Sequence, residues 1–143
     1  MTKIRARDSR RYVGIYRLYL GETTAPALRR RLQANTDRVM SVASYLDAGA
    51  VLAGRRRARP MAAISEIEGA IAEAGIRLIA VDETQARIAL DARIRFGRGF
   101  RAMAGLNYGD CFAYALAKSL DAPLLFVGDD FRATDVKAAM SGP

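Results

Sequence analysis

One stretch near the C-terminus decides the fold: LNYGDCFAYALAKSLDAPLLFVGDDFRATDV, residues 106–136. It opens with a Gly-Asp pair and an Ala-rich periodic segment, which predicts a helix from about Asp110 to Leu120. The apolar run PLLFV that comes next, residues 123–127, predicts a short buried strand. Asp129 and Asp130 come directly after this strand. Because ligands of α/β sheets bind at the carboxyl ends of the strands, these two acids stand where chemistry is expected.

Upstream of this stretch, predicted helices alternate with predicted strands. A helix start is predicted at residues 24–26, where a threonine is followed by a proline in the first turn. Ser41 can cap a helix that ends at Gly54, and Gly75 can close the helix after it. The run IRLIAV, residues 76–81, then predicts a strand. This alternation indicates an α/β domain with a mainly parallel sheet.

A further helix is predicted after this strand, where Asp82 and Gln85 have the spacing of a capping box. The apolar positions at helical spacing predict a buried face made of Ala86, Ala89, Leu90 and Ile94. The outer face carries charged positions at i, i+4 spacing that can pair weakly: Arg87, Asp91 and Arg95. The helix leads into a Gly-rich basic segment, FGRGFRAMAGLNYG at residues 96–109, which predicts a loop.

Length and composition indicate one folded domain. The chain has 143 residues, 51% of them apolar, and no linker or repeat divides it. We therefore expect residues 1–143 to form a single domain, with an atypical N-terminal part at residues 1–20. No apolar run approaches the roughly 20 residues that span a bilayer, and MTKIRARDSRRY lacks the apolar core of a secretory signal. These features predict a cytoplasmic protein without membrane contact.

The rare residue types limit the chemistry. Cys111 is the single cysteine, so an internal disulfide is excluded and a reducing compartment fits. The chain has no histidine, which excludes a Ser-His-Asp triad and a histidine-ligated zinc site. Metal chemistry in this chain has to use oxygen ligands, and these favour a hard cation such as Mg²⁺ or Mn²⁺.

The chain is strongly basic, with a formal net charge of +8 and a pI of about 10.2. Such a charge favours a nucleic acid or an acidic protein as partner. Two basic segments stand out, the loop at residues 55–59 and the group Arg95, Arg98 and Arg101. Each can be a solvated loop or a contact to phosphates, and the sequence leaves both interpretations open.

Asp47 lies inside a predicted apolar helix, where aspartate is unfavourable because its short side chain competes for backbone groups. Its neighbours on the same face are Ala43, Ser44, Ala50 and Val51, none of which is basic. A half-buried carboxylate without a partner is costly, and a bound cation would remove that cost. The alternative is that the carboxylate reaches solvent or an arginine from elsewhere in the chain.

Four further aspartates are unspecific when each is taken alone. Asp110 can be an N-cap, Asp129 and Asp130 can be turn residues, and Thr134-Asp135 can form a second cap. Taken together, acids at helix starts and strand ends of one small α/β domain suggest a shared site.

The stretch at residues 106–136 resembles the C-terminal half of VapC-type PIN-domain ribonucleases. These proteins have a Gly-Asp pair that opens an Ala-rich helix, an apolar strand, Gly-Asp/Asn-Asp-Phe, and Thr-Asp. The block SVASYLDAGAVLAGR at residues 41–55 resembles their second motif, with Asp47 in place of the usual Glu. Segments 85–87 and 95–97 also match, and the resemblance covers residues 21–139.

The resemblance implies a three-layer α/β/α PIN-like domain with a mainly parallel sheet. It also implies a ribonuclease that depends on Mg²⁺ or Mn²⁺, acts as the toxin of a type II toxin–antitoxin pair, is held inactive by a cognate antitoxin, and commonly forms a homodimer. Carried over by position, Asp47, Asp110 and Asp129 are the catalytic and metal-binding acids, and Asp130 is a substitute for Asp129.

The N-terminus departs from the family pattern, which opens with a strand ending in a metal-binding Asp. The corresponding segment here, RRYVGIYRLYLGE, contains no acid at that place, and Asp8 lies too early and is flanked by arginines. Asp47 is also one methylene shorter than Glu, so its oxygens fall roughly 1.5 Å short. We therefore expect weak or absent cleavage; the alternative is a non-catalytic protein that binds antitoxin or RNA.

A reading-frame change offers one explanation for the missing acid. Residues 14–19, Gly-Ile-Tyr-Arg-Leu-Tyr, can be encoded as GGC ATC TAC CGC CTT TAT. Read from the second base, these nucleotides give Ala-Ser-Thr-Ala-Phe-Ile, which resembles the residues directly after the first Asp in the family. The other explanation is true divergence, which would leave Arg17 at a position in the central strand where a charge is costly.

Overall fold

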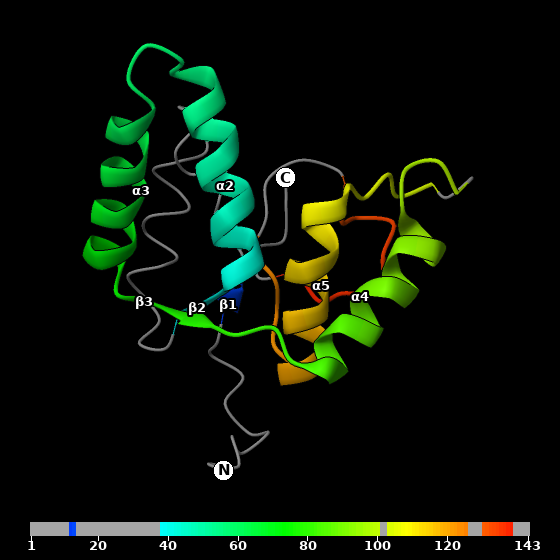
Figure 1. Ribbon diagram of the computed structural model, residues 1–143. Coiled ribbons are helices and arrows are strands. Elements are labelled where there is room, and N and C mark those ends of the chain that lie inside the picture. Colours follow the sequence, from blue (N-terminus) through cyan, green and yellow to red (C-terminus); the bar gives the residue numbers. More distant parts are fainter. Residues whose placement is uncertain (1–11, 14–37, 101–102, 126–129, 139–143) are drawn as a thin grey trace.

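The computed structural model describes residues 12–13, 38–100, 103–125 and 130–138 (Figure 1). The predicted helix start at residues 24–26 and the segment with Asp8 and Arg17 lie outside these residues. The elements follow one another as β1 (Tyr12–Val13), β2 (Arg38–Ser41), α2 (Val42–Arg55), α3 (Pro60–Ala74), β3 (Ile76–Ile79), α4 (Glu83–Phe96) and α5 (Tyr108–Leu120). The alternation of strands and helices confirms the predicted α/β class.

The strands form a small parallel sheet in the order β1-β2-β3, so β2 is the middle strand. Arg38 pairs with Ile76 at one end of β2, and Ser41 pairs with Ile79 at the other. Val39 and Met40 are buried, as expected for a strand covered on both faces. The strand predicted at residues 76–81 is confirmed, although β3 ends two residues earlier.

Most helix ends follow the sequence signals. The Ser41 hydroxyl accepts a hydrogen bond from the backbone N–H of Ala43 and caps α2, while Gly75 ends α3 in the left-handed conformation with φ 63°. Asp82 caps α4 by accepting from the N–H of Gln85. The Gln85 amide donates to the carbonyl of Ala80 instead of closing a reciprocal box.

The buried face predicted for α4 is largely wrong. Ala89 is buried as expected, but Ala86 is exposed, and Leu90 and Ile94 are 64% and 55% exposed. The helix packs instead through Gln85, Ala89 and Ala92, which are buried, and through Ile88 and Phe96, which are partly buried against the core. The pairing on its outer face is partly confirmed: Arg95 pairs with Asp91, while Arg87 pairs with Glu83.

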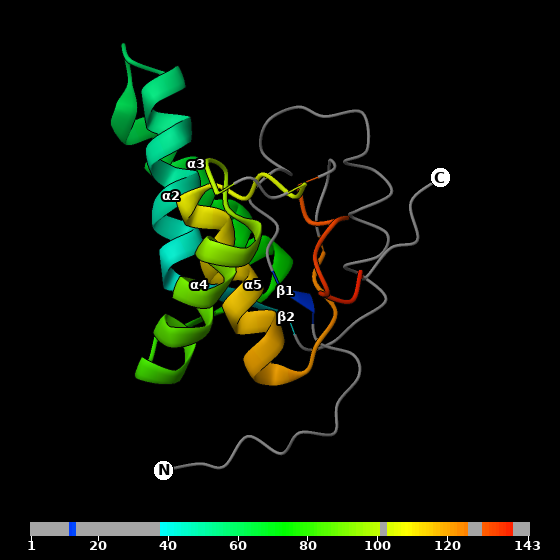
Figure 2. The ribbon, with the colours of Figure 1, turned by 90° about the vertical axis from the view of Figure 1, so that its right-hand side faces the viewer.

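The core is centred on α5, whose residues from Ala113 to Ala117 are all buried. Within the described chain, α5 packs against α4 and also contacts α2, and α2 packs against α3 (Figures 1 and 2). Ala115 and Leu116 are fully buried on this helix, and Phe112 is partly buried. No helix among the described residues is long and apolar enough to cross a membrane.

The segment after α5 returns along it without forming a regular helix or strand in its described part. Of the strand predicted at residues 123–127, Leu124 makes an isolated parallel bridge with Ala138, and residues 126–129 lie outside the described residues. Thr134 does not cap a helix. Its hydroxyl donates to the carbonyl of Phe131 and accepts from the N–H of Val136, which closes a turn.

Candidate functional site

Asp47 lies midway along α2, on a face that meets the start of α5. The contact is with Gly109, where a Cβ atom would come within 2.6 Å of the Asp47 Cγ and 3.0 Å of its Oδ1. Only a residue without a side chain leaves room for the carboxylate at this place. Because Gly109 directly precedes Asp110, the packing of α2 on α5 brings the Asp47 carboxylate to the backbone that carries Asp110.

The Asp47 carboxylate has no neutralising partner among the residues that the structure describes. Within the described part of the chain no hydrogen bond or ion pair reaches it, and partial burial raises its pKa above the ordinary value. Burial disfavours the charged form because water no longer solvates it fully. A hard cation fits such oxygen atoms, so the donor chemistry agrees with the Mg²⁺ or Mn²⁺ expected from the sequence.

Asp110 is held in the first turn of α5 by a capping box. Asn107 is the N-cap, and its side-chain oxygen accepts from the N–H of Asp110 at 2.8 Å, while Asp110 Oδ2 accepts from the N–H of Asn107 at 3.0 Å. The prediction that Asp110 itself is the N-cap is therefore wrong by three positions. The side chain is 1% exposed, so its orientation is fixed by packing as well as by the cap.

The two remaining predicted acids lie after the core segment 122–125. Asp130 is partly exposed and begins the turn that places Phe131 in the core. Asp129 lies outside the described residues. Among residues 38–100, 103–125 and 130–138, no group of three acidic or cysteine side chains is arranged to hold a metal ion. Of the acids predicted for the site, the structure thus brings the Asp47 carboxylate to the Gly109-Asp110 backbone.

The contacts of Asp135 differ from the helix cap that the sequence suggests at Thr134-Asp135, and no local sequence signal indicates them. The buried Tyr114 hydroxyl donates to the Asp135 carboxylate, and Lys118 Nζ lies 3.2 Å from it. Arg95 approaches the same carboxylate at 3.9 Å. The hydrogen bond from Tyr114 lowers the pKa of Asp135, and the bond from Lys118 adds to the effect. These contacts fasten the segment after Asp130 to α5.

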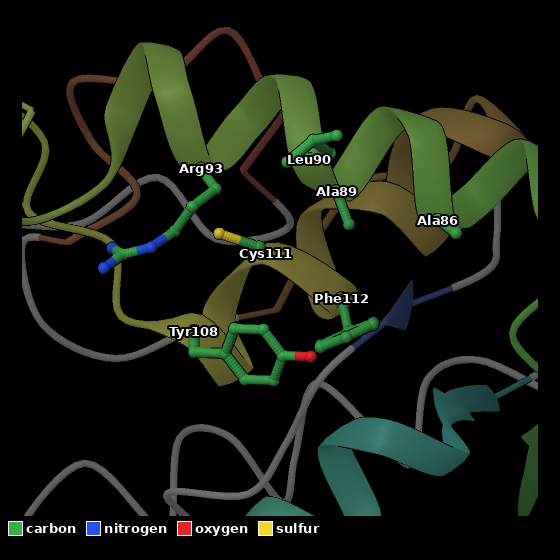
Figure 3. A pocket seen from close by; sticks show the side chains of 7 residues that line it. All are labelled: Ala86, Ala89, Leu90, Arg93, Tyr108, Cys111 and Phe112. Carbon is green, nitrogen blue, oxygen red and sulfur yellow. The ribbon is translucent and has the colours of Figure 1, made fainter.

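An apolar pocket of about 300 Å³ opens between α4 and α5 (Figure 3). It is lined by Ala86, Ala89, Leu90, Arg93, Tyr108, Cys111 and Phe112. Figure 3 shows the rings of Tyr108 and Phe112 along one wall, and their centroids are 5.2 Å apart with an edge-on geometry. Burial raises the pKa of the Cys111 thiol to about 11, so it is protonated at neutral pH and offers no nucleophile.

Comparison with known proteins finds one family and several relatives. The pattern of the PIN domain matches residues 15–137. Ribonuclease VapC from Mycolicibacterium smegmatis is 44% identical over 117 residues, which cover 82% of this chain and 88% of that protein. Ribonuclease VapC42 from Mycobacterium tuberculosis is 40% identical over 120 residues, which cover 83% of this chain and 88% of that protein. Ribonuclease VapC28 from the same organism is 45% identical over 108 residues, which cover 75% of this chain and 79% of that protein.

Proposed function

Because this chain belongs to the PIN domain family and VapC ribonucleases are among its relatives, we propose that it is a Mg²⁺- or Mn²⁺-dependent endoribonuclease, the toxin of a type II toxin–antitoxin pair. The family match extends over most of the chain, and the relatives share 40–45% of the aligned residues. Whether this chain can bind the metal ion and cleave RNA then depends on which of its acids form the metal site.

One observation carries the proposal: the Asp47 carboxylate, which has no hydrogen-bond or ion-pair partner among the described residues, lies against Gly109, next to the residue that carries the buried carboxylate of Asp110. Neighbouring carboxylates repel each other, and a divalent cation between them relieves that repulsion. The site we propose consists of Asp47, Asp110 and Asp129, with Asp130 as a substitute for Asp129.

In this site Asp47 and Asp110 supply oxygen ligands, and the capping box with Asn107 sets the direction of the Asp110 carboxylate. A Mg²⁺ ion held by these carboxylates would supply activation of a water for in-line attack on a phosphodiester and would offset the charge on the leaving oxygen. With no histidine in the chain, the protein has no imidazole for general acid–base work. The arrangement of the carboxylates therefore determines the rate.

We further propose that cleavage by this chain is weak, because the acid that opens the family pattern is missing from RRYVGIYRLYLGE. The same absence favours a second candidate, a non-catalytic protein that keeps the fold and basic charge and binds antitoxin or RNA. Sequencing the gene distinguishes a frame change at residues 14–20 from true divergence. If the shifted codons do not give a Ser-Thr-Ala-like reading, the frame explanation fails.

The proposal also concerns the fold, the oligomeric state and the partner of the enzyme. We propose a single domain with a three-layer α/β/α fold that forms a homodimer in the cytoplasm and is held inactive by a cognate antitoxin. The small parallel sheet with helices packed around it supports the fold. An antitoxin segment that places an arginine or lysine among the carboxylates would satisfy their charge. A short antitoxin gene directly upstream would support the partner.

The decisive experiment incubates the full chain with a labelled structured RNA in Mg²⁺, Mn²⁺ or EDTA, beside Asp110→Asn. We expect slow cleavage that EDTA and the substitution both abolish. Cleavage that survives in Asp110→Asn contradicts the site. No cleavage, together with tight antitoxin binding, favours the non-catalytic candidate. Cleavage as fast as that of a relative with all its acids means that another acid, such as Asp8, supplies the missing ligand.

A further inference from the structure

The connection between α2 and α3 concentrates positive charge in a few residues. Arg55 ends α2, and Arg56, Arg57 and Arg59 come next in the turn that leads to Pro60. Figures 1 and 2 both show this connection at the end of the two helices that lies away from the sheet. We call Arg55, Arg57 and Arg59 the arginine turn.

The members of the arginine turn are exposed, and no described residue compensates their charge. Arg56 differs from them, because it pairs with Glu66 at 2.8 Å. For Arg55, Arg57 and Arg59, no acidic partner exists within the described part of the chain. The first turn of α3 contains no acid either, and Glu66, the acid nearest in the sequence, pairs with Arg56.

The backbone presents these charges in a defined geometry. The N–H of Arg56 donates to the carbonyls of Leu52 and Ala53, and the N–H of Arg59 donates back to the carbonyl of Arg56 at 2.9 Å. A loop that only connects two helices needs at most one basic residue, to interact with the negative end of the helix dipole of α2. Arg55, in the last turn of α2, already provides it. The additional arginines repel one another, so their presence indicates a polyanionic partner.

The arginine turn lies near the proposed active site along the same helix. Asp47 and Arg55 are eight residues apart on α2, which is about 12 Å along the helix axis. A nucleic-acid strand advances about 3.4 Å per nucleotide in a duplex, so this span corresponds to roughly three or four nucleotides. An RNA strand that leaves the carboxylates along α2 therefore reaches the turn.

We propose that the arginine turn binds backbone phosphates of the RNA substrate a few nucleotides from the scissile bond. This inference rests on the proposed ribonuclease function for the identity of the strand. RNA is favoured over an acidic protein because residues 55–59 contain no large apolar side chain, and protein interfaces are anchored by such residues. Phosphate binding needs only charge and donors, which arginine supplies as a planar fork.

The test measures RNA binding without metal, so it does not depend on catalysis. Fluorescence anisotropy follows a labelled 12-nucleotide single strand in EDTA at several KCl concentrations, for the wild type and for Arg57→Ala/Arg59→Ala. We expect the slope of log affinity against log salt to become shallower by about 1.4, which is two lost contacts at roughly 0.7 each on a single strand. Arg57→Lys/Arg59→Lys should restore most of that slope.

The matched control removes the same charge elsewhere. Arg87 and Lys137 are exposed and paired with Glu83 and Asp121, so Arg87→Ala/Lys137→Ala should leave the salt slope unchanged.

An unchanged slope in the arginine-turn variant overturns the proposal, as does an equal loss of slope in the control variant. Normal RNA binding with weakened binding of an acidic peptide overturns it too and assigns the turn to a protein partner. If no RNA is cut in Mg²⁺ but the slopes still differ as expected, the turn stands and the ribonuclease function fails.

Discussion

The carboxylate of Asp47 in α2 lies against the α-carbon of Gly109 in α5, where an added Cβ would come within 2.6 Å of the Asp47 Cγ. This contact joins two helices that are separated by α3, β3 and α4 in the sequence. It places the Asp47 carboxylate beside Gly109, the residue directly before Asp110. The absence of a side chain at Gly109 is therefore required for this position of the Asp47 carboxylate, and the requirement can be tested directly.

Gly109→Ala should damage the site while sparing the fold. The new methyl group displaces the Asp47 carboxylate, so we expect Mg²⁺ or Mn²⁺ affinity to fall by about 10- to 100-fold, as for lost supporting residues of metal sites. Isothermal titration with Mn²⁺ measures this change. The melting temperature should move little, because alanine is the better helix residue.

Gly49→Ala is the matched control for that variant. Gly49 lies in the same helix as Asp47, and an added Cβ there meets no atom within 4 Å. We expect a gain of about 0.5–1 kcal/mol in the free energy of unfolding, from helix propensity, and unchanged Mn²⁺ affinity. Equal metal affinity in both glycine variants would contradict the role assigned to Gly109.

Asp47→Asn should stabilise the metal-free protein at neutral pH. Because burial raises the pKa of Asp47, ionisation is less favourable in the folded than in the unfolded chain, and this penalty applies above the folded pKa. Below the ordinary value of 3.8 both states hold a neutral carboxyl group, so the penalty disappears. Melting temperatures in EDTA from pH 3 to pH 7 should show the two proteins diverging as the pH rises. Parallel curves would show that the carboxylate is fully solvated.

Asp110→Asn and Asp110→Ala should separate capping from metal binding. The asparagine oxygen can still accept from the N–H of Asn107, whereas alanine loses half of the capping box and should cost about 1 kcal/mol of stability. At a Mg²⁺ concentration about 100 times the dissociation constant, the wild type should gain about 2.7 kcal/mol in the free energy of unfolding. Neither variant should gain it. A metal-induced rise in the melting temperature of Asp110→Asn would remove Asp110 from the site.

Asp135→Asn should destabilise the protein at neutral pH and have no effect in strong acid. The hydrogen bond from Tyr114 lowers the pKa of Asp135, so its contribution is complete above 3.8 and is lost as the pH falls through the lower folded value. Tyr114→Phe removes the same bond and should cost on the order of 1 kcal/mol, since the carboxylate is half exposed. The double variant should cost less than the sum of the two. Full additivity would mean that the two groups act independently.

Local signals in the sequence were sufficient for the order of elements and for several of their ends. Ser41 and Gly75 were predicted as helix ends and are confirmed, because a cap depends on only a few neighbouring residues. The lack of a basic neighbour around Asp47 was also visible in the sequence, because side chains at helical spacing are set by the helix itself. The alternation of strands and helices predicted the parallel sheet for the same local reason.

The tertiary structure decided which surfaces meet. Leu90 and Ile94 are exposed although their spacing predicts burial, because α4 approaches α5 through Ala89 and Ala92, which are small enough for close packing. Periodicity marks an apolar face but does not say whether a neighbour covers it. The contact of Asp47 with Gly109 joins residues 62 positions apart, and no local signal encodes a contact between helices so distant in the chain. Residue types and local spacing were thus enough to identify the acids and the helices that carry Asp47 and Asp110, whereas the contact of Asp47 with Gly109 follows only from the packing of α2 on α5.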